Sequence, residues 1–280
     1  MNLFDQYVQF KENHPFQKIQ IDNYSLEYLS IGNGKHTLLM LIGGSMFPSE
    51  AYFLMLEELA KSHQVLLINY PKSISSLNEL SDTFKKLLDK LSLSQVYLFG
   101  ANHGGGIAQV FAKKYPLVVK GLILYNTIAQ SNQMNKEVSE IASQLKQALH
   151  ELKELRKIVS LDQIKLSLLE QIRESLGESC DLMFYEHFIS LYQEQEEDSH
   201  MNLIKDFLDH YRFSRTDFIY LGSHSLIFYG HDIDPLGGTE FIEVLADLHP
   251  QAKLVFVETD RFQLMHQPKM MVEQILEFLK

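Results

Sequence analysis

Residues 96–109 read Val-Tyr-Leu-Phe-Gly-Ala-Asn-His-Gly-Gly-Gly-Ile-Ala-Gln. The apolar run before Gly100 predicts a buried strand, and the glycine-rich sequence after it predicts an abrupt entry into a helix that ends near Lys114. Gly100 and Gly104 flank Asn102 in the pattern G-x-N-x-G. Small residues on either side permit a sharp strand-to-helix turn, so the central residue can project from the edge of the sheet. The stretch therefore predicts a strained turn with Asn102 at its tip.

Strands and helices alternate on both sides of this turn. Strands are predicted at 18–22, 25–31, 36–42, 65–70, 96–99, 119–125, 225–229 and 253–258. Helices are predicted at 48–61, 76–91, after the turn and at 268–280. The first two strands form an antiparallel hairpin, and the remaining alternation is typical of a parallel sheet covered by helices. We expect an α/β protein with a doubly wound, mostly parallel sheet of about seven or eight strands.

The composition restricts the class of protein and of partner. The 280 residues carry 25 Lys and Arg against 36 Asp and Glu, a net charge of −11, which argues against nucleic acid or an anionic membrane as partner. Cys180 is the one cysteine, which excludes an internal disulfide and fits a reducing compartment. The start of the chain lacks the basic and apolar regions of a signal peptide, and no apolar run reaches ~18 residues. We therefore expect a cytoplasmic protein.

The glycine-rich turn resembles the nucleophile elbow of the α/β-hydrolase family, whose pattern is G-x-S-x-G. The resemblance continues through residues 112–116, Ala-Lys-Lys-Tyr-Pro, and through 119–126, Val-Lys-Gly-Leu-Ile-Leu-Tyr-Asn. Family members likewise end the elbow helix at Tyr-Pro and continue into a strand of the type V-x-G-L-I-L. The family also implies that a helical cap is commonly inserted after that strand.

A segment suited to such a cap follows Thr127. Between Lys136 and Arg212 the sequence shows only helical periodicity. The acidic stretch at 194–198 is interpreted as a solvated helix end or loop. We therefore expect an α/β-hydrolase-like core formed by residues 1–127 and 214–280, and a helical cap at 128–213.

Two of the three catalytic positions that the resemblance implies carry other residues. The family reaction needs a nucleophile, a general base and an acid that orients the base. Asn102 stands where the family has Ser, Asp or Cys, and a carboxamide neither ionises near neutral pH nor attacks a carbonyl usefully. Asn102 either only tolerates a left-handed backbone or also contacts a ligand. Arg261 falls at the histidine position and stays protonated. His266, further along, is interpreted as a helix-start histidine rather than a displaced base.

The acid and the oxyanion hole have candidates by motif. Asp234 matches the acid by its Asp-Pro sequence, and Asp232 matches it by its proximity to Gly230. Either carboxylate would face Arg261 and form an ion pair that holds loops together. A metal site at His231 and these two aspartates has weak support, so we expect no metal and no cofactor.

The predicted oxyanion hole would use the backbone N–H of His103. A second N–H would come from Gly44 or Ser45, at the end of the strand at 36–42.

Three functional hypotheses follow. The first is a hydrolase fold that has lost hydrolysis and keeps a pocket for a small molecule or protein beneath the cap. Some relatives of this fold, such as the N-myc downstream-regulated proteins, are understood to be inactive in this way. The second is an active esterase-like hydrolase with a relocated nucleophile, for which Ser45 is the best candidate and His103 or His231 the best base. A binding module unrelated to hydrolases ranks last.

Overall fold

The computed structural model describes residues 1–43, 46–133, 136–177, 181–230, 241–258 and 263–280. These residues form one sheet of eight strands in the order β1-β2-β4-β3-β5-β6-β7-β8. The strands are β1 Gln17–Ile21, β2 Tyr24–Ile31, β3 Thr37–Gly43, β4 Gln64–Asn69, β5 Val96–Asn102, β6 Val119–Tyr125, β7 Ser225–Tyr229 and β8 Lys253–Phe256. Strand β2 pairs antiparallel with β1 and β4, and every other pairing is parallel. The predicted class, a mostly parallel α/β sheet, is confirmed.

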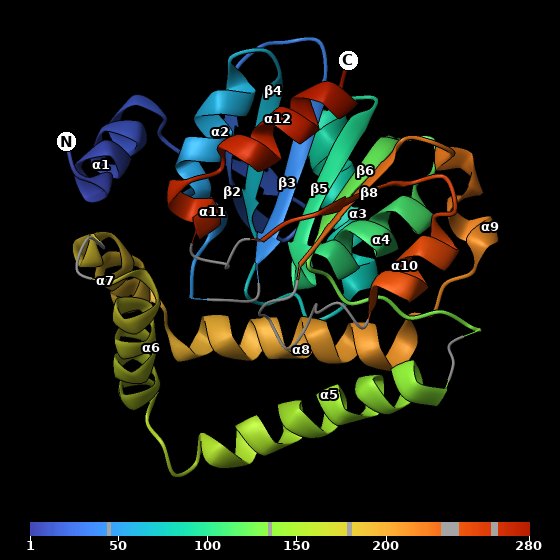
Figure 1. The fold of residues 1–280 in the computed structure, drawn as a ribbon. Helices are drawn as coiled ribbons and strands as arrows, with labels where there is room; N and C mark the ends of the chain where they lie inside the picture. Colours follow the sequence, from blue (N-terminus) through green and yellow to red (C-terminus); the bar gives the residue numbers. More distant parts are fainter. Residues whose placement is uncertain (44–45, 134–135, 178–180, 231–240, 259–262) are drawn as a thin grey trace.

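Helices cover both faces of the sheet. Those of the core are α1 Leu3–Asn13, the short 3-10 helix η1 Ser49–Tyr52, α2 Phe53–Ala60, α3 Leu77–Lys90, α4 His103–Lys114, α9 Arg215–Phe218, η2 Ile219–Leu221, α10 Ile242–Leu248, α11 Gln263–His266 and α12 Lys269–Phe278. Four more lie between β6 and α9, namely α5 Lys136–Leu155, α6 Leu161–Leu176, α7 Leu182–Leu191 and α8 Glu194–His210. In Figure 1, α8 runs along the edge of the sheet where β5 ends, and α5 lies on the far side of α8. The insertion is therefore a helical layer across that edge.

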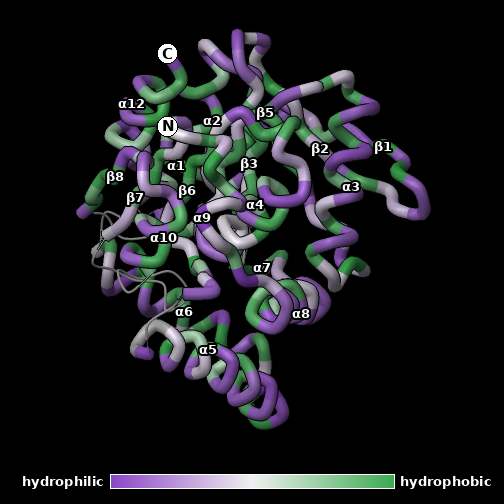
Figure 2. The backbone as a smooth tube through the Cα atoms, turned by 90° about the vertical axis from the view of Figure 1, so that its right-hand side faces the viewer, coloured by the Kyte–Doolittle hydropathy of each residue, from purple (hydrophilic) through white to green (hydrophobic). Residues whose placement is uncertain are grey.

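Side-chain alternation along the strands builds two hydrophobic cores. In β5, Val96 and Leu98 face the core that contains the buried residues of α3, α4 and α10. Tyr97 and Phe99 face the core that contains those of α1, α2, α7 and α12. Successive strand residues point to opposite faces, so a strand buried on both sides is apolar throughout. Figure 2 shows this as a continuous hydrophobic tube through the central strands, with mixed bands along α5 and α8.

Glycines let α4 lie directly against the sheet. A Cβ on Gly104 would come within 1.9 Å of the backbone oxygen of Leu41 in β3. A Cβ on Gly105 would come within 2.1 Å of Thr127 Oγ1, beyond the end of β6. Both positions are inside a helix, where glycine costs about 1 kcal/mol relative to alanine. The close approach of α4 to the sheet explains why glycine occupies these positions despite that cost.

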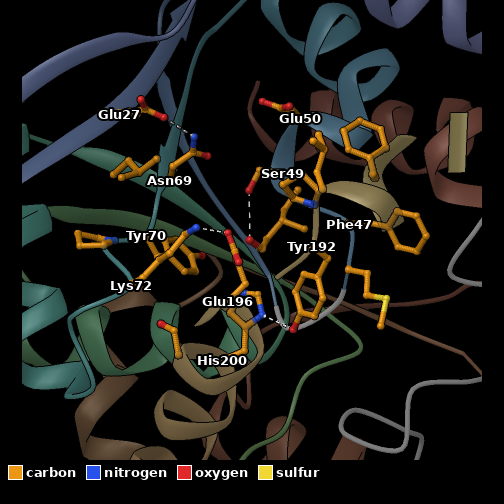
Figure 3. Close-up of a pocket in the computed structure, with 18 of the residues that line it drawn as sticks. Glu27, Phe47, Ser49, Glu50, Asn69, Tyr70, Lys72, Tyr192, Glu196 and His200 are labelled. Carbon is orange, nitrogen blue, oxygen red and sulfur yellow. Dashed lines mark hydrogen bonds and ion pairs between the residues drawn. The ribbon is translucent and has the colours of Figure 1, made fainter. Parts of the chain in front are cut away.

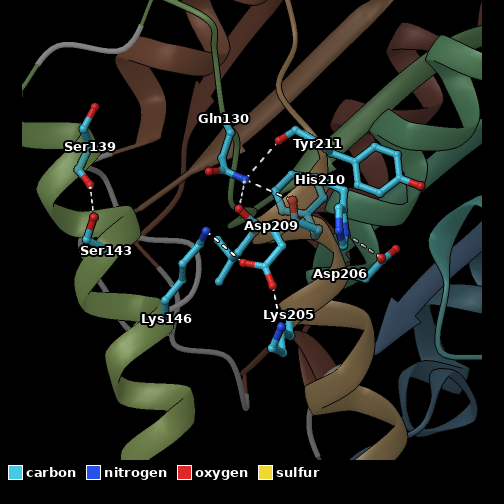
Figure 4. Close-up of polar contacts among 11 residues, drawn as sticks. Gln130, Ser139, Ser143, Lys146, Lys205, Asp206, Asp209, His210 and Tyr211 are labelled. Carbon is cyan, nitrogen blue, oxygen red and sulfur yellow. Dashed lines mark hydrogen bonds and ion pairs between the residues drawn. The ribbon is translucent and has the colours of Figure 1, made fainter.

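The two ends of the helical insertion are joined to each other. Ser131 and Phe213 form an isolated parallel bridge, and the N–H of Phe213 donates to the carbonyl of Gln130 at 2.8 Å. The buried amide nitrogen of Gln130 also donates to the carbonyls of Phe207 and Tyr211, each at 3.0 Å, and to that of Leu208 at 3.2 Å. Phe207 and Leu208 lie in the last turn of α8 and Tyr211 directly follows it, in the region where helix carbonyls run short of N–H donors. Gln130 thus caps α8 where it returns to the core (Figure 4).

Ionic contacts attach α8 to its neighbours on both sides. Asp209 contacts Lys146 of α5 at 2.9 Å and Lys205 at 2.5 Å, and the hydrogen bonds from these lysines lower the pKa of Asp209 to about 2. Asp206 accepts the N–H of Leu77 at 2.8 Å, which places a carboxylate at the N-terminus of α3. The insertion is therefore fixed to the core through α8, and α5 is fixed to α8.

Three local features differ from the sequence predictions. The helix predicted at 48–61 is divided into η1 and α2, because Tyr52 at their junction has ψ near 23° and leaves the α conformation. Helix α1 was not predicted, although Asn2 caps it by accepting the N–H of Asp5 at 2.7 Å. The acidic stretch at 194–198 begins α8 as a helix end, but Arg156 pairs with Glu194 and Glu197 of that stretch at 3.0 and 2.8 Å. Part of the acidic stretch therefore forms ion pairs within the fold in addition to contacting solvent.

The contact between α4 and β3 yields a prediction about stability. Gly104→Ala should lower the free energy of unfolding by about 3 kcal/mol, because the new methyl group overlaps a backbone oxygen that no rotamer change can remove. Gly106→Ala is the matched control in the same helix, where a Cβ meets only the ring of Phe207 at 3.1 Å. Its cost should be largely offset by the higher helix propensity of alanine. Denaturant unfolding of both variants tests this, and equal losses would contradict it.

Candidate functional site

Asn102 occupies the tip of the strand-to-helix turn. It ends β5 and precedes α4 with φ 53° and ψ −125°, a positive φ that non-glycine residues seldom adopt. The hydroxyl of Thr127 donates to its carbonyl oxygen at 2.7 Å. Gly100 behind the turn has no room for a Cβ, which would lie 2.6 Å from Gly105 Cα. The backbone conformation is held by tight packing on both sides of the turn.

The side chain of Asn102 does not stabilise the helix that follows it. Asparagine commonly caps a helix by accepting a backbone N–H, but this one makes no side-chain cap hydrogen bond. Its side chain is nevertheless buried, with 6% of the residue exposed. Asparagine is enriched at positive φ mostly in the left-handed helical region, and the ψ of −125° places Asn102 outside that region, so the predicted tolerance of a left-handed backbone does not by itself explain its presence. Contact between Asn102 and a ligand stays a prediction.

His103 begins α4, the position that the predicted oxyanion donor requires. Its buried ring lies 5.3 Å from the ring of His200 in α8 and 6.2 Å from that of Tyr70, centroid to centroid. Burial, followed by electrostatic interaction with His103 and Lys72, lowers the pKa of His200 to about 3. His200 is therefore neutral at physiological pH. An aromatic layer formed by His103, His200 and Tyr70 joins the elbow to the inserted helices.

A pocket of about 590 Å³ opens beside this layer, between the core and helices α7 and α8. Its core wall comes from the ends of β3 and β4, from η1 and from the hairpin of β1 and β2. Its other wall comes from the end of α7 and the start of α8. Figure 3 shows Tyr192 reaching His200, whose Nδ1 is 3.3 Å from the tyrosine hydroxyl. Of the residues that the structure describes, those lining the pocket include His200 but not Asn102.

Sequence reasoning did not find this pocket. Its lining side chains come from four regions of the chain, at 18–27, 42–50, 68–72 and 188–200. None of these regions carries a local motif, because the spacing between them is set by the packing of α7 and α8 on the core. The only signal was indirect, since the resemblance placed a site beneath an inserted cap.

Helix α1 supports both walls of the pocket from behind. The hydroxyl of Tyr7 donates to Glu50 Oε1 of η1 at 2.6 Å, and the Tyr7 ring lies 4.8 Å from that of Phe188 in α7. The N–H of Phe4 donates to Asp181, directly before α7, at 2.8 Å. Burial, and then the charge of Glu50, raise the pKa of Tyr7, so its hydroxyl stays a hydrogen-bond donor. Helix α1 thus links α7 to the core.

Several predicted site residues lie outside the described part of the chain. These are Gly44 and Ser45, both candidate acids Asp232 and Asp234, and Arg261. The predicted ion pair of Arg261 with Asp232 or Asp234 therefore stays a prediction. His231 of the weak metal motif lies outside it too, and the ranges that are described hold no group of three or more His, Cys, Asp or Glu suited to a metal ion. His266 was predicted to start a helix; it instead ends α11, 3.2 Å from the hydroxyl of Tyr185.

Comparisons with known proteins agree with this architecture. An α/β-hydrolase-fold protein from Chitinophaga pinensis superposes with a TM-score of 0.71 at 15% identity, over 95% of this chain and 98% of the other. A hydrolase from Pseudomonas aeruginosa PA01 gives 0.73 at 17% identity, over 95% and 98%. The chain has the α/β-hydrolase fold. At this level of identity the likeness concerns the fold and not the activity.

Within the α/β-hydrolase fold, sequence likeness points to a narrower group. Residues 61–193 match the Ndr family, a region that includes the elbow and extends to the end of α7. Maspardin of Rattus norvegicus is 31% identical over 138 residues, which are 46% of this chain and 52% of maspardin. The chain thus spans about half the length of that relative. Among the helices that the structure describes, none is long and apolar enough to cross a membrane.

The buried His200 yields a prediction about pH. Its folded pKa of about 3 lies below the unfolded value near 6.5, so the unfolded chain takes up a proton that the folded chain excludes. Its contribution to stability is complete above pH ~6.5 and is lost as the pH falls toward 3, by at most about 1.4 kcal/mol per pH unit. In His200→Gln, the free energy of unfolding measured with denaturant should decrease less steeply as the pH falls from ~6.5 to ~4.

A second buried histidine serves as comparison. Burial lowers the pKa of His249 to about 4, and its ring stacks 4.5 Å from that of Phe218, far from the elbow in sequence. His249→Gln should remove a separate part of the dependence of the unfolding free energy on pH. The unfolding free energy of the double variant should therefore depend less on pH than that of either single variant. An unchanged slope in His200→Gln would contradict the assignment.

Proposed function

We propose that this chain is a non-hydrolytic protein of the α/β-hydrolase fold that binds a small molecule in the pocket between the core and helices α7 and α8. One observation carries the proposal. The residue at the elbow, in the strained conformation that presents a nucleophile in this fold, is Asn102. A neutral carboxamide has no ionisable proton near pH 7 and cannot form the acyl intermediate of a serine-type hydrolase.

The surroundings of the elbow support loss of hydrolysis. Among the residues that the structure describes, His103 follows Asn102 and its ring contacts that of His200, which is neutral and hydrogen-bonded to Tyr192. A base that activates a nucleophile must lie within hydrogen-bond reach of a hydroxyl or thiol. Asn102 offers neither group. The likeness to the Ndr family includes the elbow, so the substitution lies within the region that the likeness covers.

The pocket supports binding as the retained activity. Its volume of about 590 Å³ falls within the range of roughly 300–1,000 Å³ typical of small-molecule sites. Its walls combine apolar side chains with a few polar groups, the usual character of such sites. A concave site of this size favours a small molecule over a protein as the ligand. The relocated-nucleophile hypothesis, with Ser45, is the alternative that experiment must exclude.

Assays of hydrolysis test the first half of the proposal. The purified protein should not react with a fluorophosphonate probe and should not hydrolyse short-chain esters above the buffer rate. Asn102→Ser should stay nearly inert, because triad members act as a unit and Arg261 at the histidine position cannot accept the hydroxyl proton. Asn102→Ser combined with Arg261→His is the variant in which measurable esterase activity would first be expected.

Ser45→Ala is the matched control for a relocated site. Ester hydrolysis by the unmodified protein that disappears in Ser45→Ala would overturn the proposal and establish the relocated nucleophile. Hydrolysis that persists in Ser45→Ala and copurifies with the protein would also overturn it, by placing a nucleophile elsewhere in the chain.

A further inference from the structure

The charged side chains of the pocket stand in pairs. Lys18 and Glu27, on the hairpin of β1 and β2, are 3.1 Å apart. Glu50 of η1 is 3.5 Å from Lys11 of α1, behind the wall. Lys72 and Glu196 form a third pair. Every carboxylate among the lining residues that the structure describes therefore has a lysine partner.

The third pair joins the core to the inserted helices across the pocket. Lys72, in the loop after β4, contacts the carboxylate of Glu196 in the first turn of α8 (Figure 3). The side chain of Glu196 is about a quarter exposed and that of Lys72 nearly half, so the pair is only partly solvated. Glu196 also accepts the N–H of Gln193 at 3.1 Å and thereby caps α8. Its position is fixed by the helix as well as by the lysine.

Among the residues that the structure describes, the other lining groups add no net charge. His200 is neutral, and the hydroxyl of Ser49 already donates to the carbonyl of Ile42 at 3.1 Å. Much of the remaining wall is apolar and comes from Ile42, Met46, Phe47, Ile68, Phe188, Leu191 and Tyr192. A charged ligand entering this space would lose solvation and find each opposite charge already engaged.

We propose that the ligand of this pocket is an electrically neutral, amphipathic small molecule, selected because the lining charges cancel in pairs. The inference rests on the proposed binding function. Burying an unpaired charge is costly, whereas an apolar body and a few hydrogen-bonding groups match the walls. The paired charges thus lower the affinity of the pocket for acids and amines of the same shape, and the neutral ligand is selected because its charged competitors bind less well.

Three probes of equal chain length test the selection in the intact 280-residue chain. They are octanamide, octanoate and octylamine, which are neutral, anionic and cationic at pH 7. Titration calorimetry should show octanamide binding at least about fivefold more tightly than either charged probe. Leu191→Trp, at an exposed position of the pocket wall, should weaken octanamide binding by narrowing the entrance and so locate it in this pocket.

Two reciprocal variants test the mechanism. Glu196→Gln leaves Lys72 unpaired while keeping a residue that can cap α8, so octanoate affinity should rise about two- to fivefold relative to octanamide affinity. Lys72→Met leaves Glu196 unpaired and should raise octylamine affinity by a similar factor. Each variant serves as the control for the other, because a general loosening of the pocket would change all three probes together.

The outcomes separate the two proposals. A charged probe that binds the unmodified protein as tightly as octanamide, and is weakened by Leu191→Trp, would overturn the neutral ligand class and leave the binding function standing. Variants that shift all probes equally would overturn charge pairing as the basis of selection. Failure of all three probes to bind at millimolar concentration would overturn the binding function itself.

Discussion

No side chain can stand between the first turn of α4 and strand β3, and the rest of the architecture depends on that contact. Gly104 brings the helix against the backbone of Leu41, and Gly100 and Gly105 let the helix and β5 meet behind the turn. The chain must then reverse sharply at Asn102 with a positive φ. A scaffold that accepts this strain without a nucleophile keeps the geometry of the fold while lacking the group that the geometry serves in hydrolases.

The inserted helices are held to the core by polar contacts and by apolar packing, because Ile204 and Phe207 of α8 and Phe188 of α7 belong to the two hydrophobic cores. Gln130 caps the end of α8, Asp206 caps the start of α3, and Lys72 reaches Glu196. At the opposite end, Tyr7 packs against Phe188 and donates to Glu50. Such directional contacts fix the orientation of a layer whose apolar side chains pack into the core. The pocket between the layers consequently has defined walls.

The pocket lies beside the elbow, and its described lining does not include the elbow residue Asn102. In a hydrolase of this fold the substrate must reach the elbow residue, because the nucleophile attacks from there. Here the rings of His103, His200 and Tyr70 lie between α4, α8 and the loop after β4, and the pocket continues along η1 and α7. Under the proposed function, recognition would take place in a pocket whose described lining does not include Asn102.

The sequence by itself determined the α/β class, most of the strands, the turn at Asn102 and the helical character of the segment between β6 and β7. These follow from periodicity and from glycine spacing, which are local properties that a single segment displays. Tertiary structure alone decided the course of α1, the pairing of Arg156 with Glu197 and the walls of the pocket. From the sequence alone, the acidic run 194–198 is interpreted as solvated. Only the tertiary structure shows that Arg156 and Lys72, which are distant in sequence, form ion pairs with it. Long-range packing fixes such pairs, and no local pattern encodes them.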